Sequence, residues 1–188
     1  MPGYVEMYVS QQRRALESIQ PNKVQKLIGI FKSALQQDRQ IFVFGNGGSG
    51  CNASHFVTDL GKSASDKLHK RFRCLSLNDN TSWITAIGND YSYEEVFLRQ
   101  LQNYAKADDV VMVLSVSGNS PNLVRAIEWC NQNSIFTIGL LGGGKGALAD
   151  LVDEAVIVDD THYGRVEDCQ MHICHMICYA FVEGFEVI

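Results

Sequence analysis

Short apolar runs alternate along most of the chain with longer segments in which apolar positions recur every three or four residues. Most of the short runs are apolar at consecutive positions, as expected for strands that are buried on both faces. They span residues 41–44, 72–77, 110–116, 136–141 and 154–158. The helical segments between them would supply the crossovers that join parallel strands. The pattern predicts an α/β fold, a flavodoxin-like three-layer αβα sandwich around a five-stranded parallel sheet.

Two helical segments precede the first strand, at about residues 4–19 and 22–38. Pro21 lies between them, where its fixed φ angle suits the first turn of the second helix. A last helix is expected from about residue 164 to residue 184. The chain therefore begins and ends in helix, with the five strands in between.

One domain is expected over residues 1–188, a length that suits a single hydrophobic core. The two helices of residues 1–38 would pack on that domain. Their apolar content exceeds what a helix lying on a small sheet needs, and such helices often contact a second copy of the chain. The side chains concerned, at the start of the first helix, are Tyr4, Val5, Met7 and Tyr8.

Composition and charge narrow the possible partners. The formal net charge of −5 argues against a nucleic-acid partner, because no basic stripe is available to neutralise a phosphate backbone. The first residues lack the apolar core of a signal peptide, and no apolar run is long enough to cross a membrane. The six cysteines form no CxxC pair, so we expect reduced thiols in the core of a cytoplasmic protein.

A glycine-rich turn follows the first strand, over residues 45–50, which we call the glycine loop. Read literally, it matches the G-x-G-x-x-G fingerprint of dinucleotide-binding proteins. That fingerprint needs an acidic residue about 20 positions later, and the nearest candidate, Asp79, comes late. We therefore interpret Gly50, the third glycine, as incidental and expect no nucleotide cofactor. An NAD-linked oxidoreductase is the least supported alternative.

A second unusual turn follows the third strand, over residues 115–120, which we call the serine loop. Hydroxyls at Ser115, Ser117 and Ser120 would converge with the free amides of the helix that Pro121 opens. Such an arrangement binds phosphate without a lysine. The alternative is that Ser120 or its neighbour only caps the helix, but one cap requires a single side chain.

Four segments together resemble the sugar isomerase (SIS) fold, and specifically the phosphoheptose isomerases. They read FGNGGSGCNASHF, TAIGNDYSYEEVF, SVSGNSPNLVRAI and GRVEDCQMHICH. The resemblance spans nearly the whole chain. It implies isomerisation of sedoheptulose 7-phosphate to D-glycero-D-manno-heptose 7-phosphate, a homotetramer with active sites between subunits, and a probable zinc ion in each subunit.

The resemblance also assigns residues by position. Contacts to the sugar are implied for Asn46, Gly47, Gly48 and Ser49, with Asn89 and Asp90 nearby, and for Glu167. Contacts to the phosphate are implied for Ser115, Val116, Ser117 and Ser120. Metal ligation is implied for His55, Asp59, Glu167 and His175, and the last three of these are also the implied catalytic residues.

The chemistry of that cluster is consistent with these roles. His55 and Asp59 are four residues apart and share a helix face, and Glu167 and His175 are eight apart on the last helix. Two imidazoles and two carboxylates suit zinc or a similar divalent ion. An aldose–ketose isomerase needs a base beside the carbonyl and an acid at the neighbouring oxygen, and these groups can supply both.

Two residues depart from the family pattern. Asp59 stands where most members have a glutamate, and Glu167 stands where they have a glutamine. Glu167 could restore the reach that the shorter Asp59 loses. The departures could instead indicate an isomerase for a different phosphosugar. They could also indicate a non-catalytic SIS module that binds a phosphosugar or a protein partner, as does the relative that associates with a bacterial replication initiator.

Overall fold

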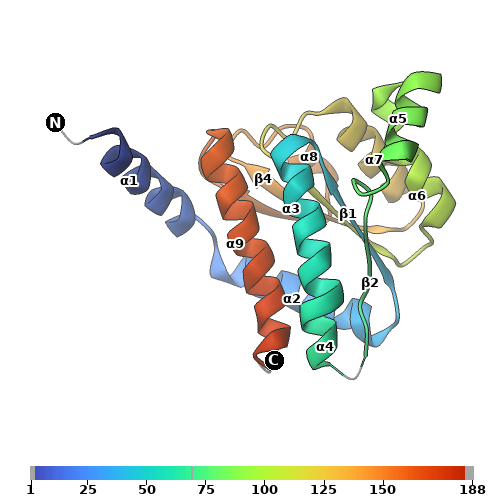
Figure 1. Ribbon diagram of the computed structural model, residues 1–188, viewed down its shortest axis with the longest axis horizontal. Coiled ribbons are helices and arrows are strands. Elements are labelled where there is room, and N and C mark those ends of the chain that lie inside the picture. The colour runs from blue at the N-terminus through green and yellow to red at the C-terminus, as the bar shows by residue number, and fades with distance from the viewer. Residues whose placement is uncertain (1–2, 69, 185–188) are drawn as a thin grey trace.

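The computed structural model, which describes residues 3–68 and 70–184, contains one parallel sheet with helices on both faces (Figure 1). The strand order is β2-β1-β3-β4-β5, and every neighbouring pair is parallel. This confirms the predicted sandwich. The strands are β1 (Gln40–Gly45), β2 (Arg73–Ser76), β3 (Val110–Ser115), β4 (Phe136–Gly142) and β5 (Glu154–Val158).

Each face of the sheet is covered by its own hydrophobic cluster. The first cluster packs under α2 (Pro21–Gln36), α3 (Gly47–Thr58) and α9 (Tyr163–Val182). The second packs under α5 (Thr81–Asp90), α6 (Leu98–Tyr104), α7 (Pro121–Gln132) and α8 (Leu148–Leu151). Every residue of β3 is buried, which explains the consecutive apolar positions that its sequence shows.

The observed ends of the helices differ slightly from the predicted ones. The first helix, α1 (Tyr4–Glu17), is shorter than expected, and α2 starts at Pro21 itself. The sequence pattern missed a π-helix, η1 (Asp59–Ala64), which extends α3 into the short α4 (Ser65–Lys67). It also missed a 3₁₀ turn, η2 (Tyr93–Glu95), after α5.

A buried carboxylate fastens α2 to the sheet. Glu154, at the start of β5, is 3% exposed and pairs with Lys23 and Lys26 of α2. Burial by itself would raise the pKa of Glu154, but the hydrogen bonds and charges of the two lysines outweigh burial, so the pKa is lowered. The ionised carboxylate therefore contributes to the attachment of α2 at neutral pH.

Helix α1 leaves most of its apolar residues uncovered. Ala15 is its one buried residue, whereas Tyr4, Val5, Met7 and Val9 are exposed. Figure 1 shows α1 extending from the body of the molecule, beside the start of α9. The apolar surface of α1 is thus larger than this chain alone can bury.

Gly50 is not incidental, and that interpretation is wrong. A Cβ at this position would lie 2.8 Å from Asn78 Nδ2 and 2.9 Å from the carbonyl oxygen of Gly45. Asn78 also bonds the backbone of Gly45, through both its amide oxygen and its amide nitrogen. The third glycine therefore lets the start of α3 approach the end of β1, which is a packing requirement and not a nucleotide contact.

The cysteines mostly match the expectation of core thiols. All six are free, and Cys130, Cys169, Cys174 and Cys178 are buried. Cys51 departs from that expectation because it is exposed on α3. Among the described residues, no helix combines the length and the apolarity that crossing a bilayer requires.

Candidate active site at the carboxyl edge of the sheet

The glycine loop and the serine loop meet because β1 and β3 are neighbours that end at the same edge. Gly45 pairs in register with Leu114, so the residues after them leave the sheet side by side. The loops enclose a pocket of about 290 Å³, which we call the carboxyl-edge pocket. Its lining residues are Asn46, Gly47, Gly48, Ser49, Leu114, Ser115, Val116, Ser117, Ser120, Tyr163 and Glu167.

A pair of amides locks the two loops together. Asn46 Nδ2 donates to Asn122 Oδ1, and Asn122 Nδ2 donates back to Asn46 Oδ1, both at 2.9 Å. The hydroxyl of Tyr93 also donates to Asn46 Oδ1, at 3.0 Å. Asn122 is buried at the start of α7; it and Tyr93 lie within segments that carry the family resemblance, but neither was given a role from the sequence. Their bonds occupy the side chain of Asn46 and hold it at the pocket wall.

The serine loop keeps a hydroxyl available at the start of α7. Ser115 Oγ accepts from the amide of Gly118 at 3.0 Å, and Ser117 Oγ accepts from the amide of Asn119 at 3.3 Å. Ser120 is the N-cap residue, yet its side chain makes no capping hydrogen bond. Simple capping therefore does not account for Ser120, whose side chain lines the pocket beside the positive end of a 12-residue helix.

Glu167 lines the same pocket, close to the backbone of Gly48. A Cβ at Gly48 would lie 2.6 Å from Glu167 Cδ, so a larger residue there would require this carboxylate to move. Burial, followed by the neighbouring charge of Asp168, raises the pKa of Glu167, and the amide of Ser49 partly offsets the rise. A carboxyl group with a raised pKa exchanges protons more readily near neutral pH.

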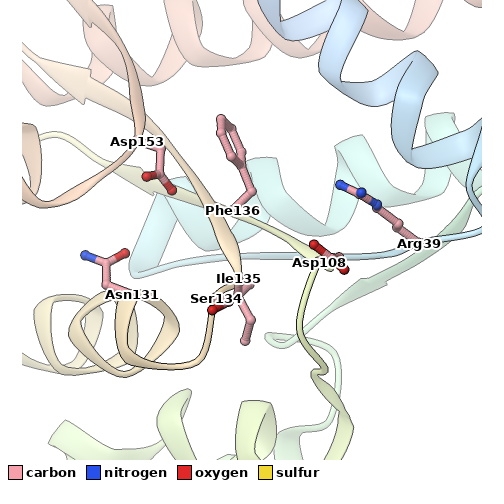
Figure 2. Close-up of a pocket in the computed structure, with 7 residues that line it drawn as sticks. All are labelled: Arg39, Asp108, Asn131, Ser134, Ile135, Phe136 and Asp153. Carbon is pink, nitrogen blue, oxygen red and sulfur yellow. The ribbon is translucent and has the colours of Figure 1, made fainter.

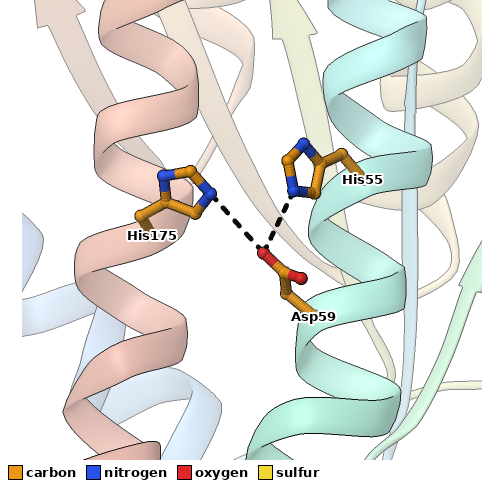
Figure 3. A group of neighbouring side chains, drawn as sticks. All are labelled: His55, Asp59 and His175. Carbon is orange, nitrogen blue, oxygen red and sulfur yellow. Dashed lines mark ion pairs between the residues drawn. The ribbon is translucent and has the colours of Figure 1, made fainter.

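Three further side chains gather beyond the pocket, between α3 and α9 (Figure 3). His55 Nε2 lies 3.3 Å from Asp59 Oδ2, and His175 Nε2 lies 3.5 Å from the same oxygen. One ligand atom from each residue lies within 4.8 Å of the others. Two imidazoles and one carboxylate at these separations fit a divalent cation. Glu167, the fourth ligand implied by the resemblance, is not part of this group and lies at the pocket.

Asp59 lies where α3 passes into a π-helix, and it still contacts His55 four residues earlier. Asp59 is the first residue of η1, where the backbone widens before Ser65 closes the segment with bonds from its amide and its hydroxyl to the carbonyl of Leu60. π-turns within helices often occur at functional sites. Sequence periodicity could not foresee this segment, since it assumes a regular α-helix.

Helices α3 and α9 run in the same direction and join the pocket to the cluster (Figure 1). Ser49 Oγ donates to Gln170 Oε1 at 3.0 Å, and Asn52 Nδ2 donates to the carbonyl of Glu167 at 2.8 Å. The helical pair therefore presents Glu167 near its start and the His55–Asp59–His175 cluster further along.

Three positions considered from the sequence, Asn89, Asp90 and Asp79, are not among the described residues that line the carboxyl-edge pocket. Asn89 and Asp90 end α5, are exposed, and bond each other at 2.9 Å. Among the described residues that line the pocket, neither appears. Asp79, the residue considered for a nucleotide ribose, accepts a short hydrogen bond from the hydroxyl of Ser54.

A second hollow, of about 310 Å³, lies at the opposite edge of the sheet (Figure 2). We call it the amino-edge hollow, because its residues precede or begin the strands. They are Arg39, Asp108, Asn131, Ser134, Ile135, Phe136 and Asp153. Asp153 Oδ2 accepts from both the amide and the hydroxyl of Thr137, at 2.8 Å each, so the carboxylate is already engaged.

Comparisons with known proteins agree with this geometry. Residues 4–142 match the model of the SIS domain family. The chain is 39% identical over 165 residues to a probable phosphoheptose isomerase of Thermoplasma acidophilum, covering 86% of this chain and 90% of that one. It is 35% identical over 171 residues to that of Thermoplasma volcanium, covering 91% and 87%. The solved phosphoheptose isomerase of Neisseria gonorrhoeae is 26% identical, with a TM-score of 0.87 and coverage of 95% and 97%.

Proposed function

This chain belongs to the phosphoheptose isomerase family of SIS-domain proteins and is an isomerase, and we propose that it interconverts sedoheptulose 7-phosphate and D-glycero-D-manno-heptose 7-phosphate. The observation that carries this proposal is the carboxyl-edge pocket. Its serine loop and α7 start are suited to a phosphate, and Glu167 lines the same pocket. In this proposal the phosphate lies at the serine loop and the reacting sugar carbons lie toward Glu167.

The reaction moves a proton between two carbons and needs no external electrons. A base removes the proton from the hydroxyl-bearing carbon beside the carbonyl, and the resulting enediolate is protonated at the former carbonyl carbon. The proton of the hydroxyl group moves to the neighbouring oxygen. We assign the carbon-bound proton to Glu167, whose raised pKa suits it to both steps. Asp59 with His175, which face each other further along α3 and α9, would form the alternative acid–base pair.

Zinc would be held by His55, Asp59 and His175. Three protein ligands leave a coordination position open, as in catalytic zinc sites. When bound, the ion would polarise the carbonyl oxygen and stabilise negative charge on it. Elemental analysis of protein purified without chelator is expected to find about one zinc per chain. The double variant His55→Ala/His175→Ala should lose the zinc, whereas His172→Ala, on the same helix, should keep it.

The exposed apolar residues of α1 support contact with further copies of the chain. The resemblance to the family is the basis for proposing a homotetramer with active sites at subunit interfaces. Free thiols at all six cysteines fit a reducing compartment, so the cytoplasm is the proposed location. Analytical ultracentrifugation of the purified chain tests the assembly. A monomer at micromolar concentration would contradict the tetramer without affecting the proposed chemistry.

An isomerase assay across five-, six- and seven-carbon ketose phosphates, with and without zinc, tests the function. The seven-carbon substrate is expected to give the highest kcat/KM, because it extends furthest from the serine loop along the seam of α3 and α9. The aldose phosphate product would be detected by its carbonyl group, which lies on the carbon next to the one that carries it in the ketose. If the protein binds the sugar phosphate but forms no product, the proposed isomerase activity is refuted. Preference for a five-carbon substrate would refute the assigned sugar.

A further inference from the structure

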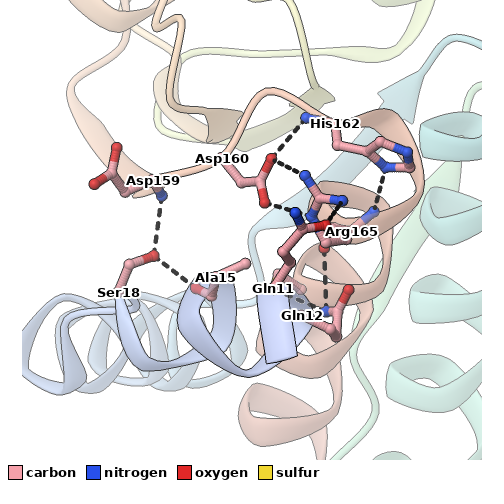
Figure 4. A network of polar contacts seen from close by, with 9 residues as sticks. Gln11, Gln12, Ala15, Ser18, Asp159, Asp160, His162 and Arg165 are labelled. Carbon is pink, nitrogen blue, oxygen red and sulfur yellow. Dashed lines mark hydrogen bonds and ion pairs between the residues drawn. The ribbon is translucent and has the colours of Figure 1, made fainter. Parts of the chain in front are cut away.

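Arg165 stands at the centre of a polar network that attaches α1 to the first turn of α9 (Figure 4). Its guanidinium donates to both carboxylate oxygens of Asp160, at 2.6 and 3.0 Å, and to Gln11 Oε1 of α1 at 3.0 Å. Its side chain is only 13% exposed. The guanidinium carbon also lies 5.8 Å from the ring centroid of Tyr8. One buried side chain therefore joins α1, the turn before α9, and α9 itself.

The other contacts of α1 in this network reach the same short stretch. Gln12 Nε2 donates to the carbonyl of Arg165 at 3.3 Å, and Ser18 Oγ accepts from the amide of Asp159 at 2.9 Å. The ring of Tyr8 meets that of His162 edge-on at 5.8 Å. Among the described residues, Gln12 Oε1 is buried without a hydrogen-bond partner.

The stretch held by this network carries two pocket residues. Tyr163 lies two positions before Arg165, and Glu167 lies two positions after it. The cap of α9 is weak in comparison, since His162 Nδ1 accepts from the amide of Arg165 at 3.4 Å. The bidentate pair between Arg165 and Asp160 is thus the strongest constraint on this turn.

We infer that Arg165 is a positioning residue for the proposed isomerisation: it couples the docking of α1 to the placement of Tyr163 and Glu167 in the pocket. It does not line the pocket itself. Loss of the Arg165 side chain would free the turn before α9 and shift the carboxylate of Glu167 within the pocket. A misplacement of about 1 Å in a reacting group lowers the rate on the order of 100-fold.

The test compares Arg165→Ala, Arg165→Lys and Asp160→Asn with wild-type protein, using Arg71→Ala as the control, because Arg71 makes an exposed ion pair with Asp66. Arg165→Ala should lower kcat on the order of 100-fold and change KM far less. Arg165→Lys should recover part of kcat, since lysine can reach one acceptor but not Asp160 and Gln11 together. The double variant Arg165→Ala/Asp160→Asn should be no worse than Arg165→Ala alone.

Amide hydrogen exchange gives a reading that does not depend on turnover. Residues 162–167 should exchange faster in Arg165→Ala than in wild type or Arg71→Ala, while the interior of α9 stays protected. A kcat within about twofold of wild type alongside a lowered Tm would overturn the inference, because it would mark a purely structural role. Unchanged exchange at 162–167 would also overturn it. An inactive wild type with the expected exchange pattern would refute the proposed substrate and leave the coupling of α1 to this turn supported.

Discussion

The two hollows at opposite edges of the sheet have similar volumes, about 290 Å³ and 310 Å³, but different chemistry. At the amino edge, carboxylates accept hydrogen bonds from the starts of neighbouring strands. Asp109 accepts from the amides of Gln40 and Lys106, and Asp153 accepts from Thr137. At the carboxyl edge, Ser120 and Glu167 face a pocket with their polar groups largely uncommitted to the fold.

The polarity of the connecting helices explains much of this difference. Helix α7 begins beside the serine loop at Ser120 and contributes Asn131, in its last turn, to the amino-edge hollow. Its partial positive charge therefore faces the carboxyl-edge pocket, and its partial negative charge faces the other hollow. An anion is favoured at the first place and opposed at the second. A parallel sheet with helical crossovers therefore places ligand chemistry at one edge and structural support at the other.

The largest expected effect is on the carboxylate that faces the pocket. Glu167→Gln should lower kcat/KM on the order of 100-fold or more, since the proton-transferring group is lost while the shape is kept. The matched change at the amino edge, Asp153→Asn, should leave kcat/KM unchanged. The measurement is steady-state isomerase kinetics with sedoheptulose 7-phosphate. Equal losses in both variants would abolish the distinction between the edges.

The pH dependence and a reciprocal exchange sharpen this prediction. Because the folded pKa of Glu167 is raised, the active carboxylate form should be lost as pH falls through a value above that of an ordinary glutamate. Asp59→Glu added to Glu167→Gln recreates the pair typical of the family and should restore part of the activity. No recovery would indicate that the two positions do not compensate each other.

The next effect concerns stability at the amino edge. Glu154→Gln should lower the free energy of unfolding by about 2 kcal/mol at pH 7. This loss is smaller than for a fully buried ion pair, because both lysine partners are partly exposed. The folded pKa of Glu154 is lowered, so the stabilisation is present above the unfolded value of about 4.3 and is lost as pH falls through the folded pKa.

Urea unfolding of both proteins between pH 7 and pH 3 measures this stability difference, which should shrink below about pH 4. Asp66→Asn, which breaks an exposed ion pair, serves as the control and should change stability by less than about 0.5 kcal/mol. Loss of catalysis per folded molecule in Glu154→Gln would contradict a purely structural role for this edge.

The smallest expected effect compares two serines. Ser120→Ala should raise KM for the phosphosugar about tenfold and leave kcat nearly unchanged, because one hydrogen bond to a charged phosphate is lost. Ser134→Ala, in the amino-edge hollow, should change neither value. Inorganic phosphate inhibition offers a second reading, since its inhibition constant should rise in Ser120→Ala alone. Identical kinetics in the two variants would contradict phosphate binding at the serine loop.

Most of the fold could be predicted because strand burial and helix period are local properties of the sequence. The five strands and the break between α1 and α2 next to Pro21 follow from such signals. Residues 59–64 show the limit, since no periodicity announces the π-helix there, although the four-residue spacing did place Asp59 beside His55. Gly50 shows another limit, because its role appears only when Gly45 and Asn78 lie beside it.

The amino-acid sequence by itself determined the sandwich, the two ligand loops and the residue types of the candidate site. Tertiary structure alone decided how those residues group. It placed Glu167 at the pocket and left His55, Asp59 and His175 as the cluster that fits a metal. It also brought Asn122 to Asn46, and Arg165 to α1. The physical reason is that side-chain chemistry is encoded residue by residue, whereas distances between helices depend on packing of the whole core.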